Sequence, residues 1–306
     1  MGRHVAADAP EADALVDEAV AGIGAEIAAL RVPGLRGAVL GGGYGRGEGG
    51  VKGPRALSND LDFYVVADDP AAAEAALAPV AEKWSARLGV DVDFCARTPR
   101  RMKLDEERLM VQELVRGHFD AAGEPGEKLF AGIERRPASA VPWTEAVRLL
   151  ANRGMGLMFA KASADQEFAA RNVAKCVLGA GDAALVVRGA YKWRAVERAE
   201  ADGGALYAAA LAWKFRPAEN PPCGWEEARE AWLAAERAVS AAGRETGADR
   251  RSLYQAARWV ARRRTLGDPR SFGRDCTVRL LRGVARCVES RTAPPPSLLE
   301  DWKIFN

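Results

Sequence analysis

The sequence predicts an α+β fold, with strands and helices in its first half and helices alone in its second. Short apolar runs lie at residues 38–40 and 63–66, as expected for buried strands. Strands are therefore expected at residues 36–41 and around residues 63–66, and a third at residues 90–96. Helical periodicity separates these runs and continues alone after a proline-containing stretch at residues 137–142. The chain therefore combines a mixed N-terminal half with a helical C-terminal half.

The length of the chain suits two domains. Its 306 residues are 48% hydrophobic and 28% charged, which is ordinary for a globular protein. We place the boundary in the proline-containing stretch and expect domains over residues 1–138 and 139–306.

Charge and cysteine usage limit the class of protein. The formal net charge of +2 gives no global attraction to nucleic acid or to a membrane. No apolar run approaches membrane-spanning length, and the N-terminus lacks a signal-peptide pattern. The five cysteines contain no Cys-x-x-Cys pair, which favours free thiols in a reducing compartment. We therefore expect a cytoplasmic protein without a membrane partner.

The first elements lead to a glycine-rich turn. Residues 1–10 are expected to form a loose tail, and residues 11–30 a helix, because apolar side chains recur there at a spacing of four. The strand at residues 36–41 ends in three glycines, so residues 42–48 should begin a helix or tight turn. Glycine lets the backbone approach a ligand closely, and free N–H groups can bind phosphate. A glycine turn without a ligand is the alternative.

Two aspartates precede the second apolar run. Side chains alternate along a strand, so Asp60 and Asp62 share one face. No Lys or Arg neighbours them on that strand, so the two carboxylates repel each other unless a hard divalent cation binds them. The connection before them, residues 49–58, is expected to be a mobile loop.

The next helix and strand repeat this arrangement. A helix should run from residue 70 to about residue 88, with a kink or a split at Pro79. The strand at residues 90–96 then carries Asp91 and Asp93 on one face.

These motifs resemble the DNA polymerase β-like nucleotidyltransferase superfamily. The stretch G-G-Y-G-R-G-E at residues 42–48 is similar to the glycine turn of bacterial protein uridylyltransferases and of minimal and antibiotic nucleotidyltransferases. N-D-L-D-F at residues 59–63 is similar to their Asp-x-Asp strand, and V-D-V-D-F at residues 90–94 to the strand with a third carboxylate. The resemblance covers roughly residues 35–100. In this chain the loop between the glycine turn and Asp60 is longer than the corresponding loop of the family.

The resemblance implies a small nucleotidyltransferase core with a short mixed β-sheet, followed by a helical domain. It implies transfer of a nucleoside monophosphate from a nucleoside triphosphate to an acceptor hydroxyl, with release of pyrophosphate. Asp60 and Asp62 would bridge two Mg²⁺ ions, and Asp93 would hold the ion that activates the acceptor, with Asp91 as the alternative ligand. Gly42 and Gly43 would hold the triphosphate in line.

Two cations are further candidates for nucleotide binding. Arg46 could contact a phosphate, or it could pair with Glu48 or an aspartate as a structural brace. A predicted helix at residues 167–188 carries a polar stripe that includes Lys175 and Asp182. That stripe either reaches the active cleft or forms a buried ionic network. Related superfamily members supply a helical-domain lysine to the triphosphate, so Lys175 is the candidate.

The rest of the second half is predicted to be helical, and its last part is rich in arginine. Helices are expected at residues 144–162, 167–188, 203–215, 225–242, 249–264 and 275–289. The last two concentrate arginine, which favours RNA as a partner. The first domain is richer in acids, so we predict a small-molecule or protein acceptor in preference to RNA. A catalytically silent nucleotide-binding module is the third interpretation, and the complete carboxylate set argues against it.

Overall fold

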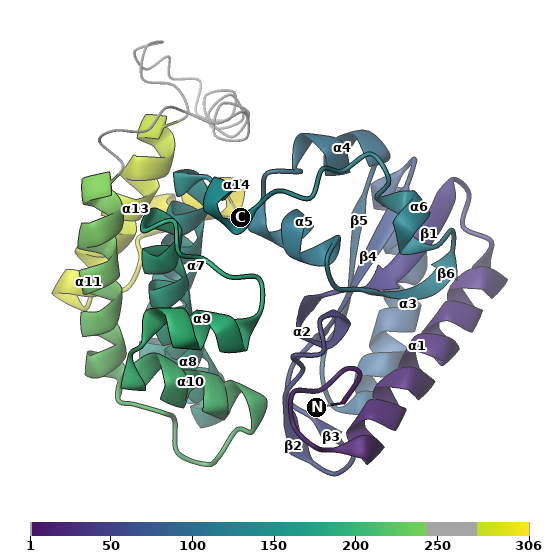
Figure 1. Ribbon diagram of the computed structural model, residues 1–306, viewed down its shortest axis with the longest axis horizontal. Coiled ribbons are helices and arrows are strands. Elements are labelled where there is room, and N and C mark those ends of the chain that lie inside the picture. The colour runs from purple at the N-terminus through teal and green to yellow at the C-terminus, as the bar shows by residue number, and fades with distance from the viewer. Residues whose placement is uncertain (1, 243–273, 306) are drawn as a thin grey trace. The chain divides into compact units, whose positions relative to one another are not determined.

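The computed structural model describes residues 2–242 and 274–305 (Figure 1). They divide into two compact units. The first contains the described residues up to Arg136 together with Phe215–Ala218, and the second contains the remaining described residues. The predicted α+β class is confirmed, because the first unit holds a four-stranded mixed sheet with helices and the second is mostly helical.

The first unit is built around its sheet, whose strand order is β5-β4-β1-β6. Strand β1 is antiparallel to both of its neighbours, whereas β4 and β5 are parallel and are joined through α3. A separate two-stranded hairpin consists of β2 and β3. In chain order the elements are α1 (Pro10–Leu30), β1 (Leu35–Leu40), α2 (Gly42–Gly45), β2 (Val51–Gly53), β3 (Ala56–Leu57), β4 (Leu61–Ala67), α3 (Pro70–Leu88), β5 (Val92–Arg97), α4 (Pro99–Leu104), α5 (Leu109–Leu114), β6 (Phe119–Gly123) and α6 (Gly126–Leu129).

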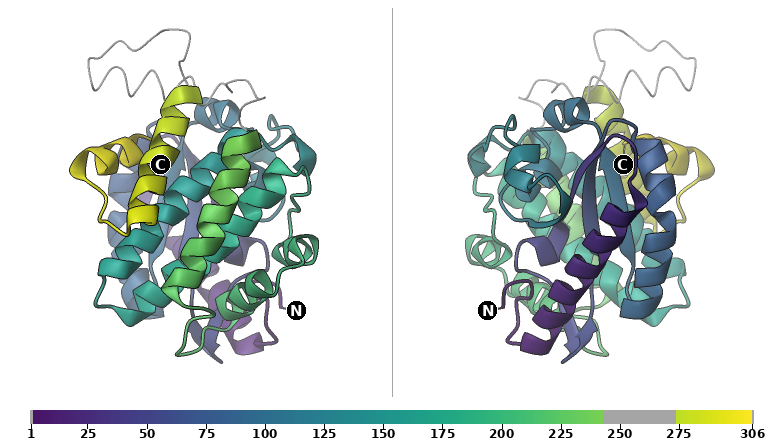
Figure 2. Two further views of the ribbon diagram at one scale, coloured as in Figure 1. Left: turned by 90° about the vertical axis from the view of Figure 1, so that its left-hand side faces the viewer. Right: turned by 90° about the vertical axis from the view of Figure 1, so that its right-hand side faces the viewer.

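Helices α1 and α3 lie side by side over one face of the sheet (Figure 2). Strand β4 contributes Leu61, Phe63 and Val65 to the core beneath them. Trp84 of α3 is 3% exposed, and its indole N–H donates to Glu26 Oε1 of α1 at 3.0 Å. The odd-numbered side chains Leu61, Phe63 and Val65 therefore face this helix pair. The even-numbered side chains of β4 face the opposite side of the sheet.

A smaller core covers part of the opposite face. Val39 and Val66 of the sheet pack there with Met102 of α4 and with Val111 and Leu114 of α5. Helix α5 is short, and its residues Leu109, Val111 and Leu114 are buried.

The N-terminal residues pack against the unit, so the expectation of a loose tail is wrong. His4 and Val5 are buried, and Asp13 accepts the three consecutive backbone N–H groups of residues 3–5 at 2.7, 2.8 and 3.0 Å. Val5 forms a parallel bridge with Gly49, whose N–H donates to the His4 carbonyl at 3.0 Å. The segment is held because one carboxylate satisfies three backbone donors.

Two further expectations are corrected in this unit. Residues 49–58 form the β2–β3 hairpin with Val51 and Leu57 buried, so they are not a mobile loop. Of the kink or split expected at Pro79, the split does not occur, because α3 is one continuous helix through that residue. Its ends agree with the sequence: Asp69 caps the N-terminus through Ala72 N–H, and Gly89 ends the helix at φ 69°.

The second unit is a group of helices in which α7 packs with α8, α11 and α13 (Figure 2). Its elements are η1 (Ala138–Ala140), α7 (Trp143–Ala162), α8 (Gln166–Val187), α9 (Ala195–Asp202), α10 (Ala205–Phe215), α11 (Trp225–Ala242), α13 (Arg274–Ser290) and α14 (Pro296–Phe305). Five predicted helices are confirmed as α7, α8, α10, α11 and α13. The helix predicted at residues 249–264 lies outside the described residues.

None of the helices in the described ranges combines the length and the apolarity needed to cross a bilayer.

Candidate active site

Two aspartates lie opposite each other where β4 and β5 begin. The parallel register pairs Asp62 with Asp93 and, two residues later, Tyr64 with Cys95. The residues on either side of Asp62 on β4, Leu61 and Phe63, belong to the α1–α3 core. The strand alternation therefore places Asp62 and Asp93 on the face opposite this core.

Asp60 immediately precedes β4, and its charge acts on Asp93 of this pair. Partial desolvation of its carboxylate by the surrounding atoms, followed by the negative charges of Asp60 and Asp91, raises the pKa of Asp93 above its ordinary value. Asp93 and Asp91 both lie on the exposed surface, and the register sets Asp93 beside Asp62. Asp60 and Asp91 thus both act on Asp93, which lies beside Asp62 at this strand edge.

The glycine turn lies directly against Asp62. Gly41 N–H donates to the Asp62 carbonyl at 2.8 Å, and this bond ties the end of β1 to the start of β4. Gly42 has φ 60°, and a methyl group added to it would lie 2.2 Å from Asp62 Oδ2. The same methyl on Gly43 would have Glu48 O as its nearest neighbour, at 3.4 Å. Gly42 is therefore required by the protein itself, whereas Gly43 leaves room beside the backbone.

Tyr44 holds the turn and the hairpin together. Its side chain is fully buried, and its hydroxyl donates to Gly50 O at 2.7 Å. The same oxygen accepts the N–H groups of Ser58 and Asn59 at 3.2 and 3.3 Å. Burial, opposed by these two N–H groups, raises the pKa of Tyr44 to about 12. The hydroxyl thus fixes the backbone immediately before Asp60.

Arg46 forms the carboxylate brace that the sequence left as one of two possibilities. Its guanidinium pairs with Glu48 Oε2 at 3.3 Å and with Glu113 Oε2 of α5 at 3.0 Å. All three side chains are largely buried. Any role in phosphate binding would have to be compatible with these two ion pairs.

Lys175 lies on α8 in the second unit and is half-buried. The polar stripe around it is partly an ionic network, the second of the two interpretations. Asp182 accepts from the Tyr207 hydroxyl at 2.6 Å and pairs with Arg198 Nε at 3.0 Å. At the neighbouring Gly179, an added methyl would lie 2.4 Å from the Arg153 side chain, so this glycine makes room for a second arginine.

Tyr64 and Glu113 also lie near the carboxylates, although neither was predicted from the sequence. Tyr64 packs against Gly41, and burial and the Asp62 charge raise the pKa of its phenol. The two-residue period that aligned the aspartates also puts Tyr64 on their face, so that signal was present in the sequence. Glu113 had no such signal, because its pairing with Arg46 depends on how α5 docks.

The carboxylates at the strand edge are the kind of oxygen donors that Mg²⁺ prefers. In the described part of the chain, no three His, Cys, Asp or Glu side chains are gathered as they would be around a metal ion. Mg²⁺ usually takes only one or two protein carboxylates and completes its shell with substrate phosphates and water. The neighbouring pair Asp62 and Asp93, with Asp60 beside it, fits that donor set.

Comparison of the chain with family models, with curated proteins and with solved structures found no match.

Proposed function

We propose that this protein is a nucleotidyltransferase that moves a nucleoside monophosphate from a nucleoside triphosphate to an acceptor hydroxyl and releases pyrophosphate. The observation that carries the proposal is the register of β4 and β5, which makes Asp62 and Asp93 direct neighbours. The glycine turn contacts the same aspartate, so an acidic pair and an open stretch of backbone lie together. Their order along the chain also resembles that of polymerase β-like nucleotidyltransferases.

The residues of the site would divide the work between metal and phosphate. Asp60 and Asp62 would hold two Mg²⁺ ions, with Asp93 as a ligand of one of them. Bound ions of this kind neutralise charge on the attacking and leaving oxygens of a phosphoryl transfer. The backbone at Gly43 has space for a phosphate to approach, and the Tyr44 hydroxyl keeps Asp60 and the turn in fixed relation. Lys175 is proposed as a triphosphate ligand from the second unit.

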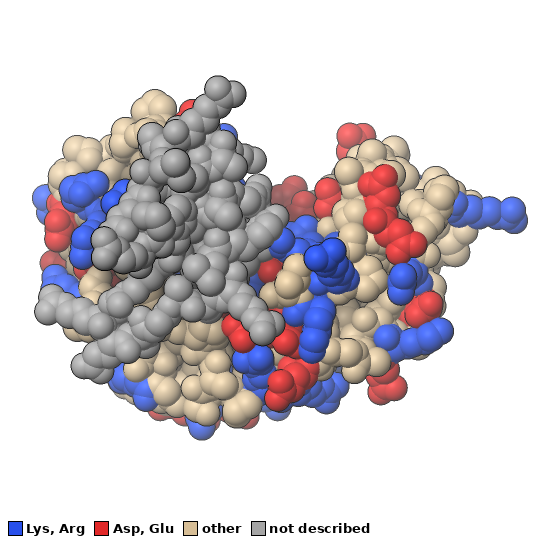
Figure 3. Space-filling view, turned by 90° about the horizontal axis from the view of Figure 1, so that it is seen from above, with Lys and Arg blue, Asp and Glu red and all other residues tan. Residues whose placement is uncertain are grey.

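The acceptor we favour is a small molecule or a protein. In Figure 3, acidic and basic side chains are interspersed over the visible surface of the first unit, whereas a nucleic-acid site usually presents a continuous basic face. An RNA-directed enzyme, of the toxin or tRNA-maturation kind, is the second candidate because arginine is concentrated in the last part of the sequence. A catalytically silent nucleotide-binding module is the third.

We also propose a cytoplasmic location. Cys95, Cys176, Cys223 and Cys287 are all free thiols, which suits a reducing compartment.

The test is transfer of label from α-phosphate-labelled nucleoside triphosphates in the presence of Mg²⁺, with fractionated cell extract as the source of acceptors. Asp62→Asn should lower transfer by about 10²–10³-fold, the loss typical of removing one electrostatic stabiliser of a transition state. Asp68→Asn is the matched control, because Asp68 is an exposed aspartate just after β4 that pairs with Arg36.

Each outcome of this test has a distinct meaning. Labelled protein or metabolite that disappears with Asp62→Asn supports the proposal. Labelled tRNA as the main product would replace the acceptor class. Nucleotide binding without transfer to any fraction would favour the silent module.

A further inference from the structure

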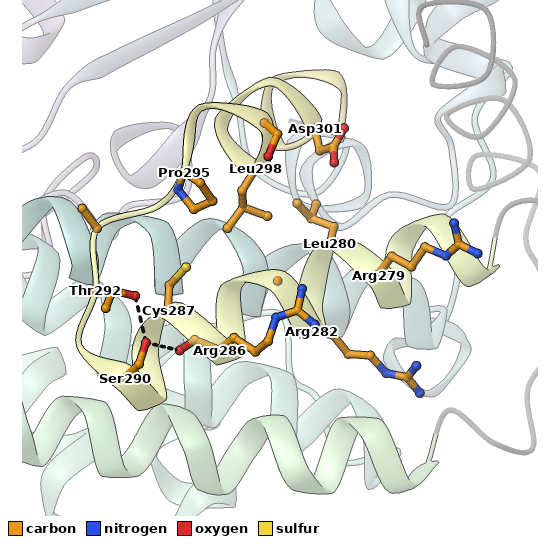
Figure 4. Close-up of a pocket in the computed structure, with 13 residues that line it drawn as sticks. Arg279, Leu280, Arg282, Arg286, Cys287, Ser290, Thr292, Pro295, Leu298 and Asp301 are labelled. Carbon is orange, nitrogen blue, oxygen red and sulfur yellow. Dashed lines mark hydrogen bonds between the residues drawn. The ribbon is translucent and has the colours of Figure 1, made fainter. Parts of the chain in front are cut away.

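A groove lies between α13 and α14, and all the residues that line it belong to the second unit (Figure 4). Its volume is about 640 Å³. Helix α13 lines it with three arginines, Arg279, Arg282 and Arg286, and α14 faces them with Leu298 and Asp301. Pockets for small ligands commonly have volumes of about 300–1,000 Å³, so the groove is of suitable size for one.

The floor of the groove is apolar and closely packed. Leu280, Cys287 and Leu298 are each less than 10% exposed. A methyl group added to Gly283 would lie 2.7 Å from Leu298 Cδ1, so this glycine lets α14 pack directly on α13. The groove is therefore a built feature of the helix pair.

Two of the three arginines on the rim of the groove form no ion pair within the described residues. Arg282 and Arg286 are exposed and are four residues apart, so they project from the same side of α13. Neither forms an ion pair with any carboxylate in the described ranges. By contrast, Arg291 nearby pairs with Glu226 at 2.8 Å, and the buried Arg198 pairs with Asp182. Two adjacent guanidinium groups without a carboxylate partner favour an anionic ligand.

Hydroxyl groups lie at the end of the groove next to Arg286. Ser290 Oγ donates to the Arg286 carbonyl at 2.6 Å and is 2.8 Å from Thr292 Oγ1. Guanidinium and hydroxyl groups together are the usual ligands of phosphate oxygens in proteins.

We propose that the α13–α14 groove is a binding site for a small phosphorylated ligand, with Arg282 and Arg286 contacting its phosphate groups and the apolar floor contacting its less polar part. The proposal does not depend on the nucleotidyltransferase assignment, because no residue of the groove belongs to the first unit.

The experiment is calorimetric titration of the full chain with inorganic pyrophosphate and, separately, with adenosine monophosphate. A metal chelator in the buffer suppresses binding at the carboxylate site. Arg282→Gln and Arg286→Gln should each weaken binding by about five- to tenfold, and the double variant by more, because each removes a charge-assisted contact. The matched control is Arg237→Gln on α11, an exposed arginine outside the groove that likewise has no ion pair in the described ranges.

Binding of either probe that weakens in the groove variants and not in Arg237→Gln supports the proposal. A comparison of the two probes tells whether phosphate alone or the attached group contributes to affinity. Wild-type protein that binds neither probe at millimolar concentration, or a double variant that binds them as wild type does, overturns the proposal. Binding of tRNA that depends on Arg282 and Arg286, without binding of the small probes, also overturns it and assigns the groove to nucleic acid.

Discussion

Replacing Gly42 by alanine tests whether the glycine turn exists to place the Asp62 carboxylate. Gly42 has φ 60°, in the left-handed region, which costs an L-residue about 1–2 kcal/mol. The new methyl would also lie 2.2 Å from Asp62 Oδ2, far inside the ordinary contact distance, so the carboxylate would have to move by about an ångström. Asp62 is only half-buried, so it can move without unfolding the unit.

Gly42→Ala should therefore have a small effect on stability and a large one on catalysis. We expect the free energy of unfolding to fall by about 1–2 kcal/mol, which lowers the melting temperature of a domain of this size by about 3–8 °C. Nucleotide transfer should fall by about 10²-fold, the usual result of a one-ångström misplacement of a catalytic group. Circular dichroism melting and the labelled-nucleotide assay measure the two effects separately.

Gly43→Ala is the control for this experiment. Its methyl would be 3.4 Å from the nearest atom, Glu48 O, so the melting temperature should remain within about 2 °C of wild type. If nucleotide lies against this backbone, the Michaelis constant for the triphosphate rises. A Gly42→Ala variant that is folded and fully active would refute the argument that the turn positions Asp62.

Two further predictions concern stability. Tyr44→Phe should cost about 2 kcal/mol, because it leaves the Gly50 carbonyl and two backbone N–H groups without their buried partner; chemical denaturation measures the loss, and an unchanged midpoint would contradict it. Hydrogen bonding from Lys83, followed by that from Trp84, lowers the pKa of Glu26. That contribution is present above the ordinary carboxyl pKa and is lost as the pH falls through the lowered value, so Glu26→Gln should lower the melting temperature at pH 7 and should have no effect in strong acid. A difference that persists in strong acid would show that charge is not the cause.

The strand alternation made much of the carboxylate face predictable. Asp60 and Asp62 could be assigned to one face from a two-residue period, and Leu61 and Phe63 to the core, because alternation is a local property. The helix ends were also local, since Asp69 and Gly89 are typical capping residues. Tyr64 follows from the same alternation and was overlooked.

Contacts between distant parts of the chain were not predictable in this way. The tail expectation failed because Val5 pairs with Gly49 and the residues before it bind Asp13, and neither partner can be identified from local pattern. Whether Arg46 forms ion pairs within the protein depends partly on Glu113, a residue of α5 that is distant from it in sequence. Strand β6 was missed because its sequence, F-D-A-A-G, has little alternation and its residues are only partly buried or exposed.

The pairing of β4 with β5 also limits how the chain can change in length. Leu61 faces Val92 and Phe63 faces Phe94 in an apolar row, with the two phenyl rings 5.4 Å apart. A slip of one residue would turn Asp93 toward the α1–α3 core and Phe94 toward solvent, and burying an unpaired carboxylate costs several kcal/mol. Insertions and deletions should therefore be accommodated around Gly89, before the strand begins. The apolar pairs on one face of the two strands thus fix the register that brings Asp62 and Asp93 together on the other face. Grafting this acidic pair onto another scaffold would therefore require transferring the apolar pairs as well.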